Sequence, residues 1–220
     1  MIAPILPSLR VVPHQFTTDD LCAGHVVLDF LNTAAGLNRD PRDWLDNYAR
    51  LVEWAGLAGV CDVDLRRTLL DLDRAEPAKG QGALEQVREL RSALYELVHH
   101  GRDGTCPPDA AVSELQQWGR RGGAALELQW DVVGSLRASF ASCGLQVIGV
   151  TIALAAADLL SRPLQGRVGV CAGRNCGWVF LDHSKSHRRR WCDMKTCGNA
   201  AKAGRHYQRK RAHEFTTGKS

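Results

Sequence analysis

Two cysteine pairs near the end of the chain decide what this region can fold into: Cys171-Ala-Gly-Arg-Asn-Cys176 and Cys192-Asp-Met-Lys-Thr-Cys197. Fifteen residues separate the pairs, and four residues lie between the cysteines of each pair. Zinc prefers four soft ligands at the corners of a tetrahedron, and thiolates at about 2.3 Å supply them. The pattern therefore predicts one structural Zn²⁺ held by Cys171, Cys176, Cys192 and Cys197.

A set of buried or disulfide-bonded cysteines is the alternative to a metal site. A chain of 220 residues with 45% apolar composition can bury a core without disulfides. Residues 1–13 contain three prolines and no long apolar run, so they do not resemble a signal peptide. We therefore expect reduced cysteines in a cytoplasmic protein.

The residues around the cysteines predict a treble-clef-like module made of a β-hairpin and a helix. Residues 178–181 should form one strand, residues 182–186 a turn, and residues 188–191 the returning strand. A helix should begin near Thr196 and continue to about Arg211. At 100° per residue, Ala200, Ala203 and Tyr207 would share the face that packs against the hairpin. Such a small module needs metal binding for much of its folding free energy.

Charge is divided unevenly along the chain, although its net value is only +4. Residues 171–220 hold 12 Lys and Arg against 3 Asp and Glu, a net charge of +9, whereas residues 1–170 have a net charge of −5. A basic surface on a rigid zinc module indicates a polyanionic partner, and nucleic acid is the partner we expect. The candidate contacts are Arg188, Arg189, Arg190, Lys195, Lys202, Arg205, Arg209 and Lys210.

Several kinds of partner fit this basic surface. A duplex is favoured over a single strand because no aromatic-rich strand offers stacking for unpaired bases, and nothing in these residues separates DNA from RNA. An RNA-binding or ribosome-associated zinc module would need similar residues, and a rigid zinc module can also dock on an acidic protein. A solvated basic surface without a partner is the least specific interpretation.

Residues 1–165 predict a mostly helical domain and residues 166–220 the zinc module, with the boundary in the proline-containing segment 162–166. Helical apolar spacing is clear over residues 40–56, from residue 62 onward, over 83–100 and over 108–118. Asp40 and Asp62 are the expected N-caps, and Gly101 the expected end of the third helix. Residues 77–82 predict a loop, residues 120–123 a turn and residues 126–130 a strand. The fold class is therefore mainly α with a small β component.

Residues 138–157 form an uncharged stretch that is long enough to cross a membrane. The stretch is rich in Ala, Ser and Gly, contains Gln146 and Thr151, and lies between Arg137 and Asp158. A buried core helix, interrupted near Gly144, explains these features better than a membrane span. We therefore expect no membrane association.

The cysteine-containing segments resemble a known family. Cys171-Ala-Gly-Arg-Asn-Cys176-Gly-Trp-Val-Phe-Leu-Asp, Arg189-Arg-Trp-Cys192 and Cys197-Gly-Asn-Ala-Ala-Lys-Ala are similar to the CGNR-type zinc finger of bacteria. Leu28-Asp-Phe-Leu-Asn-Thr33 is similar to the opening of the ABATE domain, the usual partner of this finger. The resemblance implies four cysteine ligands, DNA binding by the finger, and a role as a stress-induced transcription regulator.

One position departs from the family motif, because Ala200 stands where the motif has Arg. The zinc ligand Cys197 is kept, so the departure concerns DNA affinity and not zinc binding. Lys195 or Lys202 could take over a role of the missing side chain.

Asp29 and Asn32 are polar residues three positions apart inside an apolar run. They could line a pocket for a small-molecule effector, or they could hydrogen-bond the backbone and organise a turn, which we favour. No nucleophile–base or paired-carboxylate spacing indicates catalysis, so we expect no enzyme. The sequence thus predicts a zinc-dependent DNA-binding regulator whose helical domain senses an effector or forms a homodimer, because a small finger reads few base pairs alone.

Overall fold

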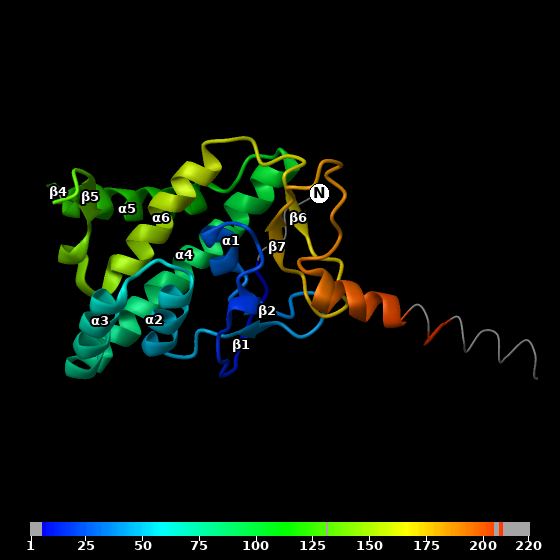
Figure 1. The fold of residues 1–220 in the computed structure, drawn as a ribbon, viewed down its shortest axis with the longest axis horizontal. Coiled ribbons are helices and arrows are strands. Elements are labelled where there is room, and N and C mark those ends of the chain that lie inside the picture. Colours follow the sequence, from blue (N-terminus) through cyan, green and yellow to red (C-terminus); the bar gives the residue numbers. More distant parts are fainter. Residues whose placement is uncertain (1–5, 131, 205–206, 209–220) are drawn as a thin grey trace, which may run out of the picture.

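The helices form a body at one end of the molecule, and the zinc module lies at the other end (Figure 1). The computed structural model describes residues 6–130, 132–204 and 207–208. The body contains α1 (Val26–Leu31), α2 (Tyr48–Leu57), α3 (Val63–Ala75), α4 (Pro77–Asp103), α5 (Asp109–Ala125) and α6 (Val147–Leu160). The long helix α4 is central, because it contacts each of the other five. Its predicted apolar stripe is confirmed, since Leu84, Val87, Leu90 and Leu94 are fully buried.

Local sequence signals set the ends of α3 and α4. The Asp62 carboxylate accepts a hydrogen bond from the Leu65 backbone N–H at 2.8 Å, so this predicted N-cap is confirmed. Helix α4 begins at Pro77, where the missing N–H of proline costs no hydrogen bond. It ends at Gly104, whose φ of 66° suits glycine. The expected loop over residues 77–82 and the expected end at Gly101 are therefore wrong.

The helix that was expected to begin at Asp40 begins at Tyr48 instead, with the Asn47 side chain as its N-cap. The preceding residues form the strand β3 (Arg42–Asp43). It lies between β1 (Arg10–Val11), to which it is parallel, and β2 (Ala34–Ala35), to which it is antiparallel.

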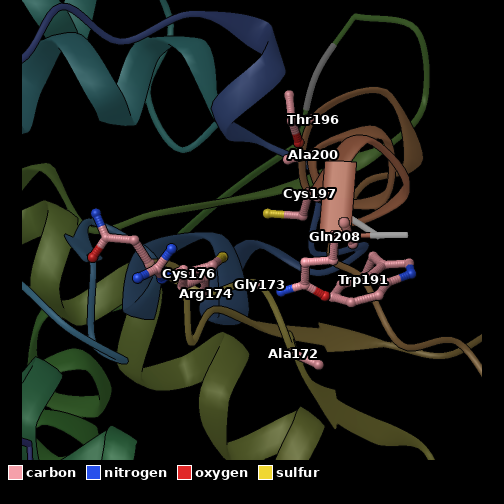
Figure 2. A pocket seen from close by; sticks show the side chains of 12 residues that line it. Ala172, Gly173, Arg174, Cys176, Trp191, Thr196, Cys197, Ala200 and Gln208 are labelled. Carbon is pink, nitrogen blue, oxygen red and sulfur yellow. The ribbon is translucent and has the colours of Figure 1, made fainter. Parts of the chain in front are cut away.

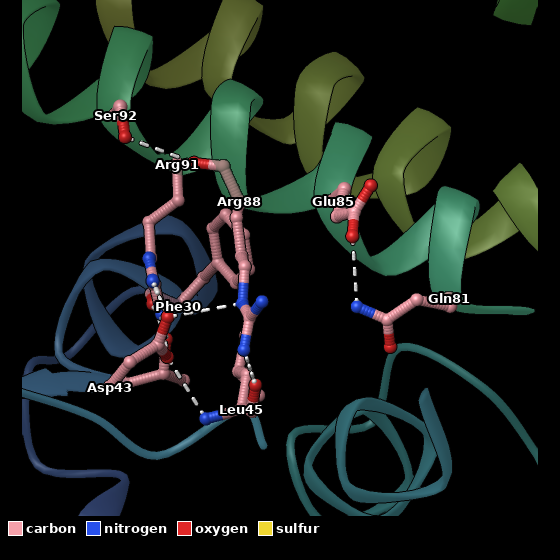
Figure 3. A network of polar contacts seen from close by, with 9 residues as sticks. Phe30, Asp43, Leu45, Gln81, Glu85, Arg88, Arg91 and Ser92 are labelled. Carbon is pink, nitrogen blue, oxygen red and sulfur yellow. Dashed lines mark hydrogen bonds and ion pairs between the residues drawn. The ribbon is translucent and has the colours of Figure 1, made fainter. Parts of the chain in front are cut away.

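A buried ion pair explains why residues 42–43 extend as a strand. Figure 3 shows the Asp43 carboxylate facing Arg91 and Arg88 of α4, with oxygen–nitrogen distances of 2.6 Å to Arg91 Nη2 and 3.1 Å to Arg88 Nε. Asp43 and Arg91 are only 4% and 2% exposed. Leaving one of two buried charges without its partner costs about 3–5 kcal/mol. This tertiary requirement outweighs the local helix-start signal at Asp40.

Helix α5 continues through residues 120–123, so the turn expected there is wrong. The glycine signal at this place has another cause, which is close packing between helices. A Cβ on Gly122 would lie 2.9 Å from a methyl carbon of Val150 in α6. Small residues thus let α5 and α6 approach each other.

The expected strand after α5 is confirmed as β4 (Glu127–Trp130), which pairs antiparallel with β5 (Leu136–Ser139). The 3-10 helix η2 (Ala141–Gln146) follows, so the helix expected from residue 138 begins later. Gly144 interrupts the helical stretch within η2, as predicted, with φ 54° and ψ −129°.

One segment, Ala141–Leu160, is long and apolar enough to cross a membrane by length and composition alone. Its α6 part packs against α1, α4 and α5 and buries Val147, Ile148, Val150 and Ile152. Helix α6 therefore lies in the core of the helical body, as predicted.

The zinc module consists of the antiparallel hairpin β6 (Val168–Val170) and β7 (Val179–Leu181), the π-helical turn η3 (Met194–Gly198) and the helical residues 199–204. The expected strand over 178–181 is confirmed. Its partner is β6, which precedes the first cysteine pair, and residues 188–191 are not a strand. The predicted class, mainly α with a treble-clef-like zinc module, is confirmed.

Candidate metal centre

The four cysteines of the two pairs meet at the end of the β6–β7 hairpin. Cys171 and Cys176 belong to the loop between β6 and β7, Cys192 precedes η3, and Cys197 lies within η3. Their Sγ atoms all lie within 4.8 Å of one another, with 3.6 Å between Cys176 and Cys192 and 3.8 Å between Cys192 and Cys197. A tetrahedral zinc with bonds of about 2.3 Å places its sulfurs about 3.8 Å apart. The four thiols thus fit one structural Zn²⁺, as predicted.

The close approach of the four thiols also means that a bound cation would favour their ionised form. Hydrogen bonds from the Cys176 and Cys192 thiols lower the pKa of the Cys171 thiol. The same contacts raise the pKa of Cys176 and of Cys192. Four thiols this close, three of them buried, cannot all ionise unless a positive charge offsets theirs, and Zn²⁺ supplies that charge.

Two local features shape the loops around the metal. A Cβ on Gly173 would lie 2.9 Å from Cys176 Cβ and 3.0 Å from Cys197 Sγ, so the first loop can close only with glycine there. The Gly173 backbone N–H also donates to Cys171 Sγ at 3.4 Å. In the second pair, Asp193 caps η3 by accepting from the Thr196 N–H at 2.8 Å, which positions Cys197.

Asp29 and Asn32 both bond backbone groups, as the favoured interpretation predicted. Asp29 accepts from the Ala23 N–H at 2.9 Å, and burial raises the pKa of its carboxyl to about 6. Asn32 reaches into the zinc module. Its Nδ2 donates to the Val179 carbonyl at 3.0 Å, and its Oδ1 accepts from the Val179 N–H at 2.9 Å. The predicted ligand-binding role thus has no support in these contacts.

A second segment of the N-terminal domain binds the first cysteine loop directly. Asn38 Nδ2 donates to the carbonyls of Cys171 at 3.3 Å and Gly173 at 2.6 Å. The Leu37 backbone N–H donates to the Cys176 carbonyl at 2.8 Å. These two residues were not predicted as part of the site, because the only signals in their segment are the neighbouring glycine and asparagine, which favour a turn. The metal loops are therefore held partly by the N-terminal domain.

Arg189 was predicted to contact nucleic acid, but the structure places it inside the module. Its side chain is half-buried, and its guanidinium carbon lies 4.5 Å from the centre of the Phe180 ring. The guanidinium donates to the carbonyls of Trp191 at 2.9 Å, Leu181 at 3.2 Å and Cys22 at 3.3 Å, and also to that of Cys192. This arginine therefore holds the segment before Cys192 in place and has little donor capacity left for a ligand.

The other predicted contacts within the described part of the chain lie on the surface. Arg188, Arg190, Lys195 and Lys202 are all exposed. Arg205, Arg209 and Lys210 lie outside the described residues. Ala200, Ala203 and Tyr207 are exposed too, so the expected packing of these three against the hairpin is wrong.

A groove of about 740 Å³ runs between the first cysteine loop and the helical residues that follow η3 (Figure 2). Its lining includes Gly173, Arg174, Trp191, Ala200, Gly204 and Gln208. The methyl group of Ala200 and the absence of a side chain at Gly204 leave the groove open. Ala200, the position that departs from the family motif, therefore contributes space rather than charge.

The fold and the four-cysteine site define a zinc-finger protein with a helical N-terminal domain. Residues 24–163 match the model of the ABATE family, described as "Putative stress-induced transcription regulator", and residues 167–210 match the CGNR zinc finger. The chain belongs to the ABATE family and carries a CGNR zinc finger, so the resemblance noted in its sequence is confirmed. No curated protein matches the chain.

Proposed function

We propose that the chain is a transcription regulator that binds duplex DNA through its zinc-loaded finger. The observation that carries the proposal is the exposure of Arg188, Arg190, Lys195 and Lys202 on the module that the metal holds together. Cations on a rigid support can neutralise several phosphates at once, and each neutralised phosphate releases a condensed counterion.

The two kinds of cation have different roles in this proposal. Arginine can clamp a phosphate or bind a guanine edge with two hydrogen bonds, whereas lysine mainly binds phosphate. Arg190 stacks over Trp191, with its guanidinium carbon 5.3 Å from the ring centre, so its orientation is restrained. If about five phosphates are neutralised, the logarithm of affinity should fall with the logarithm of salt with a slope of about −4 to −5.

Zinc dependence follows from where the basic residues lie. Lys195 belongs to η3 together with the ligand Cys197, and Arg188 and Arg190 precede the ligand Cys192. Loss of the metal would release these segments from a common support. We therefore expect DNA binding to disappear when the metal is removed.

The test is sequencing of genomic DNA fragments that the purified, zinc-loaded protein captures, with Cys192→Ser as the zinc-deficient control. Enrichment of one motif that disappears in the variant supports the proposal. No enrichment above the variant contradicts it. A competition between duplex DNA and structured RNA then decides whether an RNA-binding module is the better description.

A second experiment tests the proposed surface itself. Replacing Arg188 and Arg190 by alanine should weaken duplex binding by about 10-fold or more while zinc stays bound. The matched control replaces Arg67 and Arg74 of α3, whose side chains are both 71% exposed on the helical body. Equal affinity of the two double variants for duplex DNA would mean that Arg188 and Arg190 are not part of the DNA-binding surface.

We also propose that the chain is a cytoplasmic binding protein and not an enzyme. Four thiolates leave the metal no open coordination position, so the metal would be structural and not catalytic. A small-molecule effector stays a prediction. Of the described cavities, one of about 260 Å³ lies where the two domains meet and is lined by Asp19, Arg42, Trp44, Trp178 and Thr196, among others. A molecule bound there would touch both domains.

A further inference from the structure

The hairpin of β4 and β5 presents an apolar face to solvent. The register pairs Leu128 with Ala138 and Trp130 with Leu136, so these four side chains share one face of the two-stranded sheet. Leu128 is 57% exposed, Trp130 73% and Leu136 58%. The opposite face carries the polar residues Glu127, Gln129, Arg137 and Ser139. The hairpin is therefore amphipathic, with its apolar side in water.

This arrangement is unfavourable for an isolated hairpin. Among the described elements, the extensive contacts of β4 and β5 are with each other and not with any helix. A two-stranded sheet is marginally stable in water unless its apolar face is covered by further strands or by a helix. A partner that covers this apolar face would therefore stabilise the hairpin.

The exposed apolar area is large enough for a stable interface. Three more large apolar residues of the hairpin segment are exposed: Leu126 by 45%, Val132 by 105% and Val133 by 80%. Together with the three large side chains on the strands, they expose on the order of 800 Å², which is what each partner buries in a standard-size interface. Patches of this size are larger than monomeric proteins usually leave in water.

Charge narrows the choice of occupant. Residues 126–139 contain two acidic residues and one basic residue, a net charge of −1. A surface that docks on anionic lipid is rich in Lys and Arg, which this hairpin lacks. An amphipathic, nearly neutral patch is instead suited to meet an identical patch, because a two-fold interface requires a self-complementary surface.

We propose that the β4–β5 hairpins of two copies of this chain pack apolar face to apolar face about a two-fold axis, which makes the protein a homodimer. The hairpin lies at the end of the molecule opposite the zinc module (Figure 1). The dimer therefore leaves the basic residues of both fingers accessible. This proposal concerns self-association and stands independently of whether the finger binds DNA.

Sedimentation velocity of the zinc-loaded full chain over a wide concentration range tests the proposal. The expected species is a dimer of the 24.1 kDa chain. Replacing Trp130 and Leu136 by serine should weaken dimerisation at least about 100-fold, because each side chain is buried twice in a symmetric interface. The matched control replaces Glu127 and Gln129 by serine on the opposite face, and its dimerisation constant should stay within about 3-fold of the wild type.

Circular dichroism and zinc content establish that both double variants are folded. A wild-type chain that stays monomeric at every concentration overturns the proposal. A dimer that the Trp130 and Leu136 substitutions do not weaken also overturns it, because another surface must then form the dimer. A monomer that sediments with phosphatidylcholine and phosphatidylserine vesicles would assign the hairpin to a membrane surface instead.

Discussion

Both polar atoms of the Asn32 side-chain amide form hydrogen bonds with a single residue of β7, Val179. The donor and the acceptor match the Val179 carbonyl and N–H in the way that a neighbouring strand would. The bonded groups are buried. A buried peptide group that loses its partner costs about 1–3 kcal/mol, so this amide stabilises the strand that leads away from Cys176.

Replacing Asn32 by alanine should therefore lower zinc affinity as well as stability. Residues that support metal ligands from outside typically change affinity by about 10- to 100-fold when they are lost. Competition with a chromophoric chelator measures the effect. The control is Asn175→Ala, an exposed asparagine inside the first cysteine loop. Equal zinc affinity of the two variants would show that Asn32 supports only the protein fold.

Asp29 should make stability depend on pH. Burial raises its pKa from 3.8 to about 6, so the folded state binds a proton more tightly than the unfolded state does. Stability attributable to this group therefore rises as the pH falls from about 6 toward 3.8. Between pH 7 and pH 5 the wild type should gain about 1 kcal/mol relative to Asp29→Asn. Urea unfolding of both proteins at the two pH values, with zinc content verified, measures the difference. A constant difference would mean that the carboxyl titrates normally.

At the scale of helices and strands, local signals predicted the elements whose ends depend only on nearby residues. The cap at Asp62, the strand β4 and the interruption at Gly144 belong to this group. The signal at Asp40 misled because Asp43 must reach Arg91, which lies 48 residues away in sequence. Gly122 and Gly123 of α5 likewise predicted a turn, although α5 continues there and Gly122 lies where α6 packs closely. Such partners cannot be seen in a local pattern.

The packing of α5 against α6 gives a paired prediction. A Cβ on Gly149 would lie 2.4 Å from the ring of the fully buried Trp118, so Gly149→Ala should destabilise the fold by about 1–3 kcal/mol. Gly119→Ala in α5 meets nothing within 4 Å and should stabilise the fold by up to about 1 kcal/mol. Thermal unfolding compares the two. The same sign for both substitutions would contradict this account of the helix contact.

At the scale of the whole molecule, the two domains share hydrogen bonds at the metal. Asn32, Leu37 and Asn38 come from the N-terminal domain, and their partners lie in or beside the first cysteine loop. The four ligands could be predicted because their spacing is local. The role of Asn38 could not, because its partner Cys171 lies 133 residues away. Arg189 bonds Trp191, Leu181 and Cys192 nearby in sequence and Cys22 167 residues away, and a run of three arginines does not show which of them turns inward. Which basic side chains are exposed likewise depends on how the module folds and cannot be read from their order in the sequence.

Removing the metal should thus disturb both domains. We expect chelation to raise amide exchange across the zinc module and also over residues 32–38, while α4 stays protected in the core. Hydrogen exchange measured by mass spectrometry, with and without chelator, makes the comparison. Unchanged exchange over residues 32–38 would show that the N-terminal domain does not respond to the metal.

The bond between Asn32 and Val179 also determines when the metal centre can be completed during synthesis. Its two residues are 147 positions apart, and the ligand Cys197 follows still later in the chain. A ribosome produces the helical domain first, and that domain must wait for the finger to emerge before Asn32 finds its partner. The four-cysteine site can therefore be completed only after the helical domain has been synthesised. Until β7 has been synthesised, both polar atoms of the Asn32 side-chain amide lack their hydrogen-bond partners on Val179.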